Sequence, residues 1–183
     1  IEPYLTDQWF LNVKPLAKEV IKAVKKKETV FYPTNWTKTF YLWMDEIEPW
    51  CISRQIWWGH RIPVWYGHDN KIFVAKDEQE ANNMALSYYK KKTKLIQETD
   101  VLDTWFSSAL WPMSTLGWPE KETIFFKKYF PTNVLVTGFD IIFFWVARMM
   151  MQSANFVNNV PFKNVYIHAL VRDKHGNKMS KSK

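Results

Sequence analysis

Three segments in the last third of the chain constrain its fold more than any other feature. Residues 133–137 and 163–171 are rich in β-branched and other apolar residues, as buried strands are, and residues 141–155 between them predict a helix. A strand, a crossover helix and a second strand place the two strands parallel to each other. The pattern therefore predicts an α/β fold.

A short basic loop follows the second of these strands. Lys178 and Lys181 are three residues apart, with Met179 and Ser180 between them. Because the loop leaves the end of a sheet strand, it lies where open α/β sheets place their ligands. Two ammonium groups in such a loop are suited to stabilise negative charge on a polyphosphate.

The rest of the chain predicts further helices and short strands. One helix is expected from Pro15, with Leu16, Val20, Ile21 and Val24 on one face, and another from Thr37, with Phe40, Trp43, Met44 and Ile47 on one face. Two more helices are expected, one from Asp77, with Ala81, Met84, Ala85 and Tyr88 on one face, and one over residues 104–113. Strands are expected over residues 29–32, 61–66, 71–75 and 93–97, with a hairpin turn at residues 67–70.

Five blocks of sequence carry a resemblance to a known family. They are residues 2–10, 50–63, 102–111, 137–145 and 178–183. With them the chain resembles the class I aminoacyl-tRNA synthetases, and the last block is similar to the KMSKS signature of that family. The blocks that begin at Trp105 and Gly138 resemble the valyl type rather than the isoleucyl type.

The resemblance implies an architecture and a division of the chain. It implies the second half of a Rossmann-type parallel sheet with small helical and β-hairpin insertions. We expect residues 1–63 to follow an editing insertion, residues 64–99 to form a small hairpin and helix insertion, and residues 100–183 to form the Rossmann half. The chain is then an internal fragment of a longer protein, without editing activity.

The implied function is that of a valine–tRNA ligase, an enzyme of protein biosynthesis. Such an enzyme activates valine with ATP to valyl-adenylate and transfers it to tRNA(Val). The family's other ATP motif, of the His-Ile-Gly-His type, is not in the sequence, so we expect the fragment alone to be inactive. Two alternatives stay open: an isoleucyl-type synthetase, and a non-catalytic binding or structural module derived from this domain.

The resemblance also implies site residues, each of which has a simpler interpretation. Asp140 could be a helix N-cap, Ile141 and Trp145 core side chains, and His168 a buried, hydrogen-bonded histidine. No role is implied for Trp57, Trp58 or His60. The implied ATP-binding residues are Gly138, His168, Leu170, Lys178, Ser180 and Lys181, of which Lys178 and Lys181 are catalytic, and the implied amino-acid pocket is Trp105, Asp140, Ile141 and Trp145.

Composition limits the remaining classes. A formal net charge of +7 suits a polyanion such as tRNA, although the lysines opposite the apolar face of the first helix are more often simply solvated. The single cysteine, Cys51, is interpreted as a small buried side chain in a reducing, cytoplasmic setting. We expect no zinc or other bound metal, Mg²⁺ only with ATP, and no membrane segment.

Overall fold

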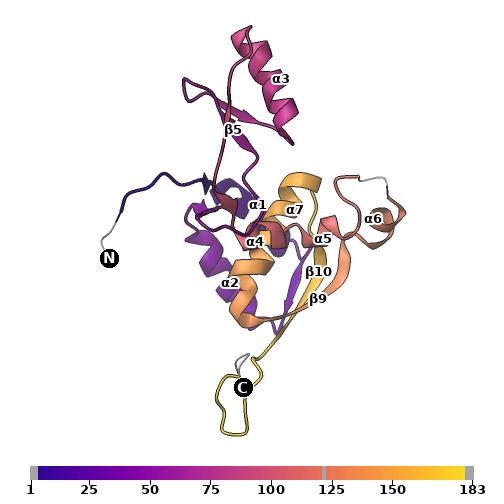
Figure 1. Ribbon diagram of the computed structural model, residues 1–183. Coiled ribbons are helices and arrows are strands. Elements are labelled where there is room, and N and C mark those ends of the chain that lie inside the picture. The colour runs from indigo at the N-terminus through magenta and orange to yellow at the C-terminus, as the bar shows by residue number, and fades with distance from the viewer. Residues whose placement is uncertain (1–3, 121–122, 180–183) are drawn as a thin grey trace. The chain divides into compact units, whose positions relative to one another are not determined.

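The computed structural model describes residues 4–120 and 123–179 (Figure 1). The chain folds as two compact units. Unit 1 comprises Ile1–Phe10 and Cys51–Thr104, and unit 2 comprises Leu11–Trp50 and Trp105–Lys183. The division into residues 1–63, 64–99 and 100–183 stays a prediction.

Unit 2 is built on a three-stranded parallel sheet. Its order is β2 (Val30–Tyr32), β10 (Phe162–His168) and β9 (Thr132–Gly138), and both pairs of strands are parallel. Val165 lies opposite Phe31 and Leu135 across the three strands, and all three side chains are buried. The predicted parallel pair is therefore confirmed, and β10 ends three residues earlier than expected.

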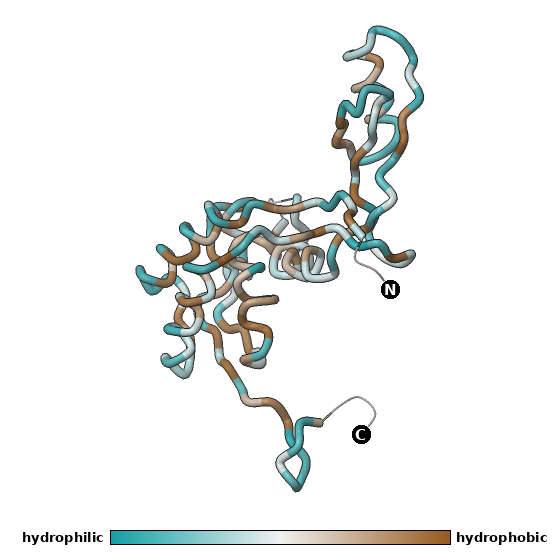
Figure 2. The backbone as a smooth tube through the Cα atoms, turned by 90° about the vertical axis from the view of Figure 1, so that its left-hand side faces the viewer, coloured by the Kyte–Doolittle hydropathy of each residue, from teal (hydrophilic) through white to brown (hydrophobic). Residues whose placement is uncertain are grey.

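Three helices contribute to the core of unit 2. They are α1 (Lys14–Lys25), α2 (Asn35–Asp45) and α7 (Arg148–Val157). In Figure 2 hydrophobic and hydrophilic residues alternate along the helices, as expected for helices with one buried face. Of the stripe predicted for this helix, Phe40 and Met44 are buried and Trp43 is half-buried, while Ile47 is buried but follows the end of α2.

The segment predicted as one helix over residues 141–155 is instead divided among three kinds of helix. A 3₁₀ turn, η1 (Phe139–Ile141), is followed by a π-helical segment, η2 (Ile142–Ala147), and then by α7. The π segment holds three consecutive bulky aromatic residues, which cannot all lie on one buried face of an α-helix. In the wider turn each aromatic ring has its own partner: Phe143 with Trp43, Phe144 with Trp105, and Trp145 with Trp111.

The helix predicted over residues 104–113 is broken in two. The pieces are α4 (Thr104–Ser108) and α5 (Trp111–Ser114). Pro112 is responsible, because it has no N–H for the carbonyl group four residues earlier. A further short helix, α6 (Ile124–Tyr129), begins after Thr123, whose hydroxyl accepts a hydrogen bond from the N–H of Phe126 at 3.1 Å.

Unit 1 contains a small antiparallel sheet covered by one helix. Its strands β5 (Val64–Tyr66), β6 (Ile72–Val74) and β7 (Ile96–Gln97) lie in the order β6-β5-β7. Helix α3 (Glu78–Tyr89) is capped by Asp77, whose carboxylate accepts from the N–H of Glu80 at 2.8 Å. The predicted hairpin and cap are therefore confirmed.

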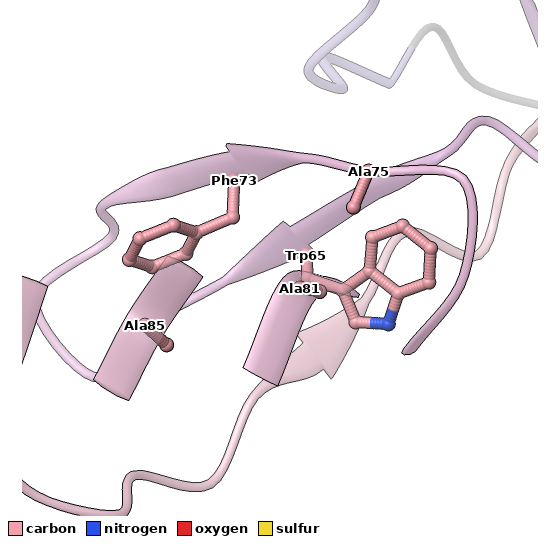
Figure 3. Close-up of a cluster of buried hydrophobic side chains, with 5 residues drawn as sticks. All are labelled: Trp65, Phe73, Ala75, Ala81 and Ala85. Atoms are coloured by element: carbon pink, nitrogen blue, oxygen red, sulfur yellow. The ribbon is translucent and has the colours of Figure 1, made fainter. Parts of the chain in front are cut away.

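A small hydrophobic core holds this sheet to α3 (Figure 3). It consists of Trp65, Phe73, Ala75, Ala81 and Ala85, all of them buried. Met84 and Tyr88, which were predicted on the same face of the helix as the two alanines, are 41% and 55% exposed. Strands of two or three residues cover only a narrow stripe of the helix, and the two alanines fill it.

The remaining strands are pairs of residues. β1 (Phe10–Leu11) and β3 (Trp50–Cys51) form a two-stranded sheet, and β4 (Ser53–Arg54) pairs antiparallel with β8 (Val101–Leu102). The Cys51 side chain is half-buried, with its Sγ 3.7 Å from Oε1 of Gln8. Across residues 4–120 and 123–179 no helix is long and apolar enough to cross a membrane.

A polar network in unit 1 is centred on Glu98. Its carboxylate accepts hydrogen bonds from Trp9 Nε1 at 2.9 Å, from the Tyr66 hydroxyl at 2.5 Å and from the N–H groups of Thr99 and Asp100. Partial burial raises the pKa of Glu98, but these four hydrogen bonds outweigh it and lower the pKa to about 2. Burial and the adjacent carboxylate raise the pKa of Tyr66 to about 12. Glu98 therefore stays ionised and Tyr66 stays protonated at neutral pH.

Candidate functional site

The carboxyl ends of β9 and β10 bring four of the predicted site residues together. Gly138 and His168 are opposite each other in the sheet register. A side-chain Cβ at Gly138 would lie 2.6 Å from Oδ1 of Asp140, 3.6 Å from the His168 ring and 3.8 Å from Cδ2 of Leu170. Residues from two strands and the turn after each strand therefore converge on the buried backbone of Gly138.

A side chain at Gly138 would crowd the site. A Cβ atom within 3.0 Å of a carboxylate oxygen requires that oxygen to move, and the nearest oxygen belongs to Asp140 at 2.6 Å. The lack of a Cβ leaves the end of β9 open to close approach by a ligand.

Asp140 is not a helix cap. Gly138 occupies the N-cap position of η1, and no side chain caps that turn. The Asp140 carboxylate faces the basic loop instead, with Oδ2 4.0 Å from Nζ of Lys178. At that distance and exposure the ion pair contributes about 0–1 kcal/mol, so a ligand can displace it.

His168 is exposed, which contradicts the interpretation as a buried histidine. Its Nδ1 lies 2.8 Å from the carbonyl oxygen of Ala169. The imidazole therefore contacts the backbone of the next residue at the carboxyl end of β10, the central strand, beside Gly138.

The basic loop that carries Lys178 is organised around Asp173. The Asp173 carboxylate accepts from the N–H groups of His175 and Asn177, both at 2.8 Å, and from Nδ2 of Asn177 at 3.1 Å. The backbone hydrogen bond from Asn177 is the largest cause that lowers the pKa of Asp173. Ser180 and Lys181, the other predicted residues of the loop, lie outside the described residues.

A cavity of about 340 Å³ brings together three predicted pocket residues, Trp105, Ile141 and Trp145. Trp105 comes from α4, and the other two come from η1 and η2, so the cavity joins segments that are well separated in the sequence. Ser108 and Trp111 complete its lining. Trp105 and Trp145, which the resemblance implies for one pocket, therefore line this cavity together with a third tryptophan, Trp111.

A hydrogen bond fixes the orientation of Trp145. Its indole Nε1 donates to the carbonyl oxygen of Ser108 at 3.2 Å. Ser108 is four residues before Pro112, which cannot donate to that carbonyl. The same proline that breaks the helix therefore leaves an acceptor for the pocket tryptophan. The presence of Pro112 was the signal that could have identified Ser108 from the sequence.

The three residues for which no role is implied are all exposed. Trp57 and Trp58 are 106% and 91% exposed, and His60 is also exposed. Among residues 4–120 and 123–179 there is no group of three or more His, Cys, Asp or Glu side chains that could hold a metal ion.

Comparison with known families agrees with the fold. A family described as "tRNA synthetases class I (I, L, M and V)" matches residues 2–183, so the chain belongs to this family. Within it, the chain is similar to valine–tRNA ligases. It is 61% identical to that of Brucella melitensis over 183 residues, 58% to that of Rhodopseudomonas palustris over 202 residues and 59% to that of Pelagibacter ubique over 183 residues.

All three similarities extend over 100% of this chain and 20% to 21% of each relative. The chain therefore spans about one fifth of the length of these relatives. The resemblance identified from the sequence is confirmed at the level of the family.

Solved structures show the same fold at low sequence identity. Methionyl-tRNA synthetase of Mycobacterium tuberculosis, bound by methionyl-adenylate, superimposes with a TM-score of 0.61 at 16% identity, over 96% of this chain and 28% of that one. LeuRS of Agrobacterium radiobacter K84, in a ternary complex with tRNA and LeuAMS, gives a TM-score of 0.59 at 20% identity, over 74% and 21% of the two chains. The predicted α/β class with a parallel sheet is confirmed.

Proposed function

We propose that this chain is part of a longer class I synthetase that activates valine and transfers it to tRNA(Val). In the first step a carboxylate oxygen of valine attacks the α-phosphorus of ATP, the bond to the bridging oxygen of the β-phosphate breaks, and pyrophosphate leaves. In the second step a ribose hydroxyl of the tRNA attacks the carbonyl carbon of valyl-adenylate and AMP leaves. A cytoplasmic location belongs to the same proposal.

The cavity carries this proposal. Trp105, Ile141 and Trp145 were implied as the walls of a valine pocket, and all three line one cavity of about 340 Å³. A rigid, largely aromatic wall suits a small branched aliphatic side chain and disfavours a larger one. The 58% to 61% identity to valine–tRNA ligases favours valine over the isoleucyl alternative.

The residues around Gly138 suggest how the other groups are held. Asp140, adjacent in sequence to the cavity residue Ile141, would accept the ammonium group of valine. Gly138, His168 and Leu170 would contact the adenosine, largely through the backbone at the open end of the sheet. Lys178, together with Ser180 and Lys181, would lie over the phosphates.

The role of these lysines in the proposal is electrostatic. The pentacoordinate transition state at phosphorus gathers negative charge, which a positioned ammonium group stabilises without forming a covalent bond to the enzyme. Mg²⁺ would enter with ATP as part of the substrate. We expect no zinc, and we expect the 183-residue chain alone to be inactive.

ATP–pyrophosphate exchange by the full-length protein tests the proposal. We expect exchange that depends on valine and is much weaker with isoleucine. Trp145→Ala should raise isoleucine-dependent exchange relative to valine, because it enlarges the cavity. Trp118→Ala is the matched control, since the Trp118 ring packs on Phe156 at 5.2 Å and does not line the cavity. If the full-length protein shows no valine-dependent exchange, the alternative of a non-catalytic binding or structural module is favoured.

A further inference from the structure

One end of unit 1 gathers lysines from two separate segments. The turn between β5 and β6 packs against the last residues of α3: the His68 and Tyr89 rings are 4.9 Å apart, and the Tyr89 hydroxyl donates to the Asp69 carboxylate. Lys71 follows this turn, and its Nζ lies 5.0 Å from the centroid of the Tyr88 ring. The lysines that follow α3 are therefore close to Lys71. We name Lys71, Lys90, Lys91, Lys92 and Lys94 the lysine tip.

The backbone of the lysine tip is held in place. Lys90 ends α3 in the left-handed conformation, with φ 56°, and its N–H donates to the carbonyl of Leu86 at 2.9 Å. Tyr89 and Leu95, on either side of the lysines, both pack on the hydrophobic core of the unit. The ammonium groups are therefore carried by an ordered turn, which lowers the entropic cost of binding a partner.

The charge of the lysine tip is only partly compensated. All five lysines are exposed, and none has an ion pair within the described residues. Asp69 accepts a hydrogen bond from the Tyr89 hydroxyl, which is the largest cause that lowers its pKa, so its ionised carboxylate offsets about one of the five positive charges. By contrast, three lysines in or just after α1 pair with glutamates: Lys14 with Glu48, Lys22 with Glu19 and Lys26 with Glu28.

The acidic residues of the same helix lie at its other end. Asp77, Glu78 and Glu80 are at the N-terminus of α3, which is 12 residues long. At a rise of 1.5 Å per residue the two ends are about 18 Å apart. That distance is about twice the screening length of ~8 Å at physiological ionic strength. The acidic end therefore does little to weaken the field at Lys90, Lys91, Lys92 and Lys94, whereas Glu80 and Lys71 line one pocket.

We propose that the lysine tip binds the phosphate backbone of RNA. Clustered, unpaired lysines beside an exposed aromatic ring are typical of a nucleic-acid surface. The Tyr88 ring, 55% exposed, is available beside Lys71. The identity of the RNA as tRNA rests on the proposed function. The surface lies in unit 1 and shares no residue with the amino-acid cavity in unit 2.

Binding of a tRNA(Val) transcript by the full-length protein, measured between 50 and 200 mM salt, tests this surface. The variant carries Lys90→Gln, Lys91→Gln, Lys92→Gln and Lys94→Gln. The control carries Lys18→Gln, Lys25→Gln, Lys27→Gln and Lys38→Gln, which remove the same charge from exposed lysines of unit 2 without an ion pair among the described residues.

We expect the tip variant to bind more weakly, with a slope of log K against log salt smaller by about 3, since each lost phosphate contact removes about 0.7–0.9. The control should change the slope by less than about 1. Equal changes in both variants, or no change in the tip variant, would overturn the proposal.

Valine-dependent ATP–pyrophosphate exchange separates this proposal from the proposed function. Exchange needs no tRNA, so the tip variant should keep the wild-type rate, which also shows that it folds. If the wild-type protein shows no valine-dependent exchange, the proposed function is refuted. The RNA-binding measurement then still decides whether the lysine tip binds RNA. If the tip variant has normal exchange and binds tRNA as the wild-type protein does, only the proposal that the lysine tip binds RNA is refuted.

Discussion

Gly138 is the residue at which the smallest change should have the largest effect. In Gly138→Ala the new Cβ would lie 2.6 Å from Oδ1 of Asp140, so the carboxylate must move. We expect kcat/KM for valine activation to fall by about 10²-fold, because misplacement of a positioning group by about 1 Å costs that much. Val136→Ala, on the same strand with an exposed side chain, is the control. Wild-type kinetics in Gly138→Ala would mean that Asp140 does not hold the substrate.

Lys178 is the described lysine of the basic loop that faces the site. Lys178→Ala should slow valyl-adenylate formation by about 10²–10³-fold with little change in valine affinity, because its charge acts on the transition state. Lys174→Ala removes the same charge from the same loop and should have a small effect. Rapid-quench measurement of adenylate formation distinguishes the two. Equal slowing in both variants would show that the loop acts through its overall charge.

Among the elements, the break between α4 and α5 sets the shape of the cavity. Pro112→Ala restores an N–H that competes with Trp145 Nε1 for the Ser108 carbonyl. We expect KM for valine to rise about 5- to 10-fold, the equivalent of one hydrogen bond of about 1 kcal/mol, with the fold retained. Pro49→Ala, at an exposed proline after α2, serves as the control. An unaltered KM would show that the hydrogen bond does not position the indole.

The Glu98 network makes unit 1 sensitive to acid. The pKa of Glu98 is lowered from 4.5 to about 2, so its carboxylate stabilises the fold above pH 4.5 and this contribution is lost as the pH falls toward 2. Glu98→Gln should therefore flatten the acid dependence of stability. At pH 7 it should lower the free energy of unfolding by about 1 kcal/mol, a value reduced by solvent screening.

Urea unfolding followed by tryptophan fluorescence at pH 7, 4 and 3 measures this dependence. Glu46→Gln, at an exposed glutamate, controls for the loss of one charge. The account of the network is wrong if Glu98→Gln and the wild-type protein lose stability in parallel between pH 4.5 and 3.

Prediction from the sequence succeeded for elements defined by short-range patterns. The hairpin at residues 67–70, the Asp77 cap and the strands that became β9 and β10 depend on neighbouring residues, and the structure confirms them. The π segment was missed because three adjacent aromatic residues find separate partners in other elements. The exposed Met84 was missed because the width of the covering sheet is a tertiary property.

The candidate site was predictable only in part for the same reason. Trp105, Ile141 and Trp145 belong to blocks with a family resemblance, and all three line the cavity. Ser108 and Trp111 were missed, because their place in the lining depends on the break before α5 and on a hydrogen bond across 37 residues. Periodicity within one segment carries no information about such a contact.

At the scale of the whole molecule, the two units differ in what they offer a partner. Unit 2 holds the sheet, the cavity and the residues proposed to bind ATP and valine. Unit 1 holds the lysine tip on a small hairpin and helix with a core of its own. A division of this kind would let one unit bind the small substrates while the other unit contacts the RNA.

A crystal structure of the full-length protein with a non-hydrolysable analogue of valyl-adenylate is the most direct test of the central claim. The account predicts that the isopropyl group lies between Trp105, Ile141 and Trp145, that the ammonium group contacts Asp140, and that the adenosine lies over Gly138. An analogue bound away from this cavity, or a cavity that stays empty beside a bound analogue, would contradict it.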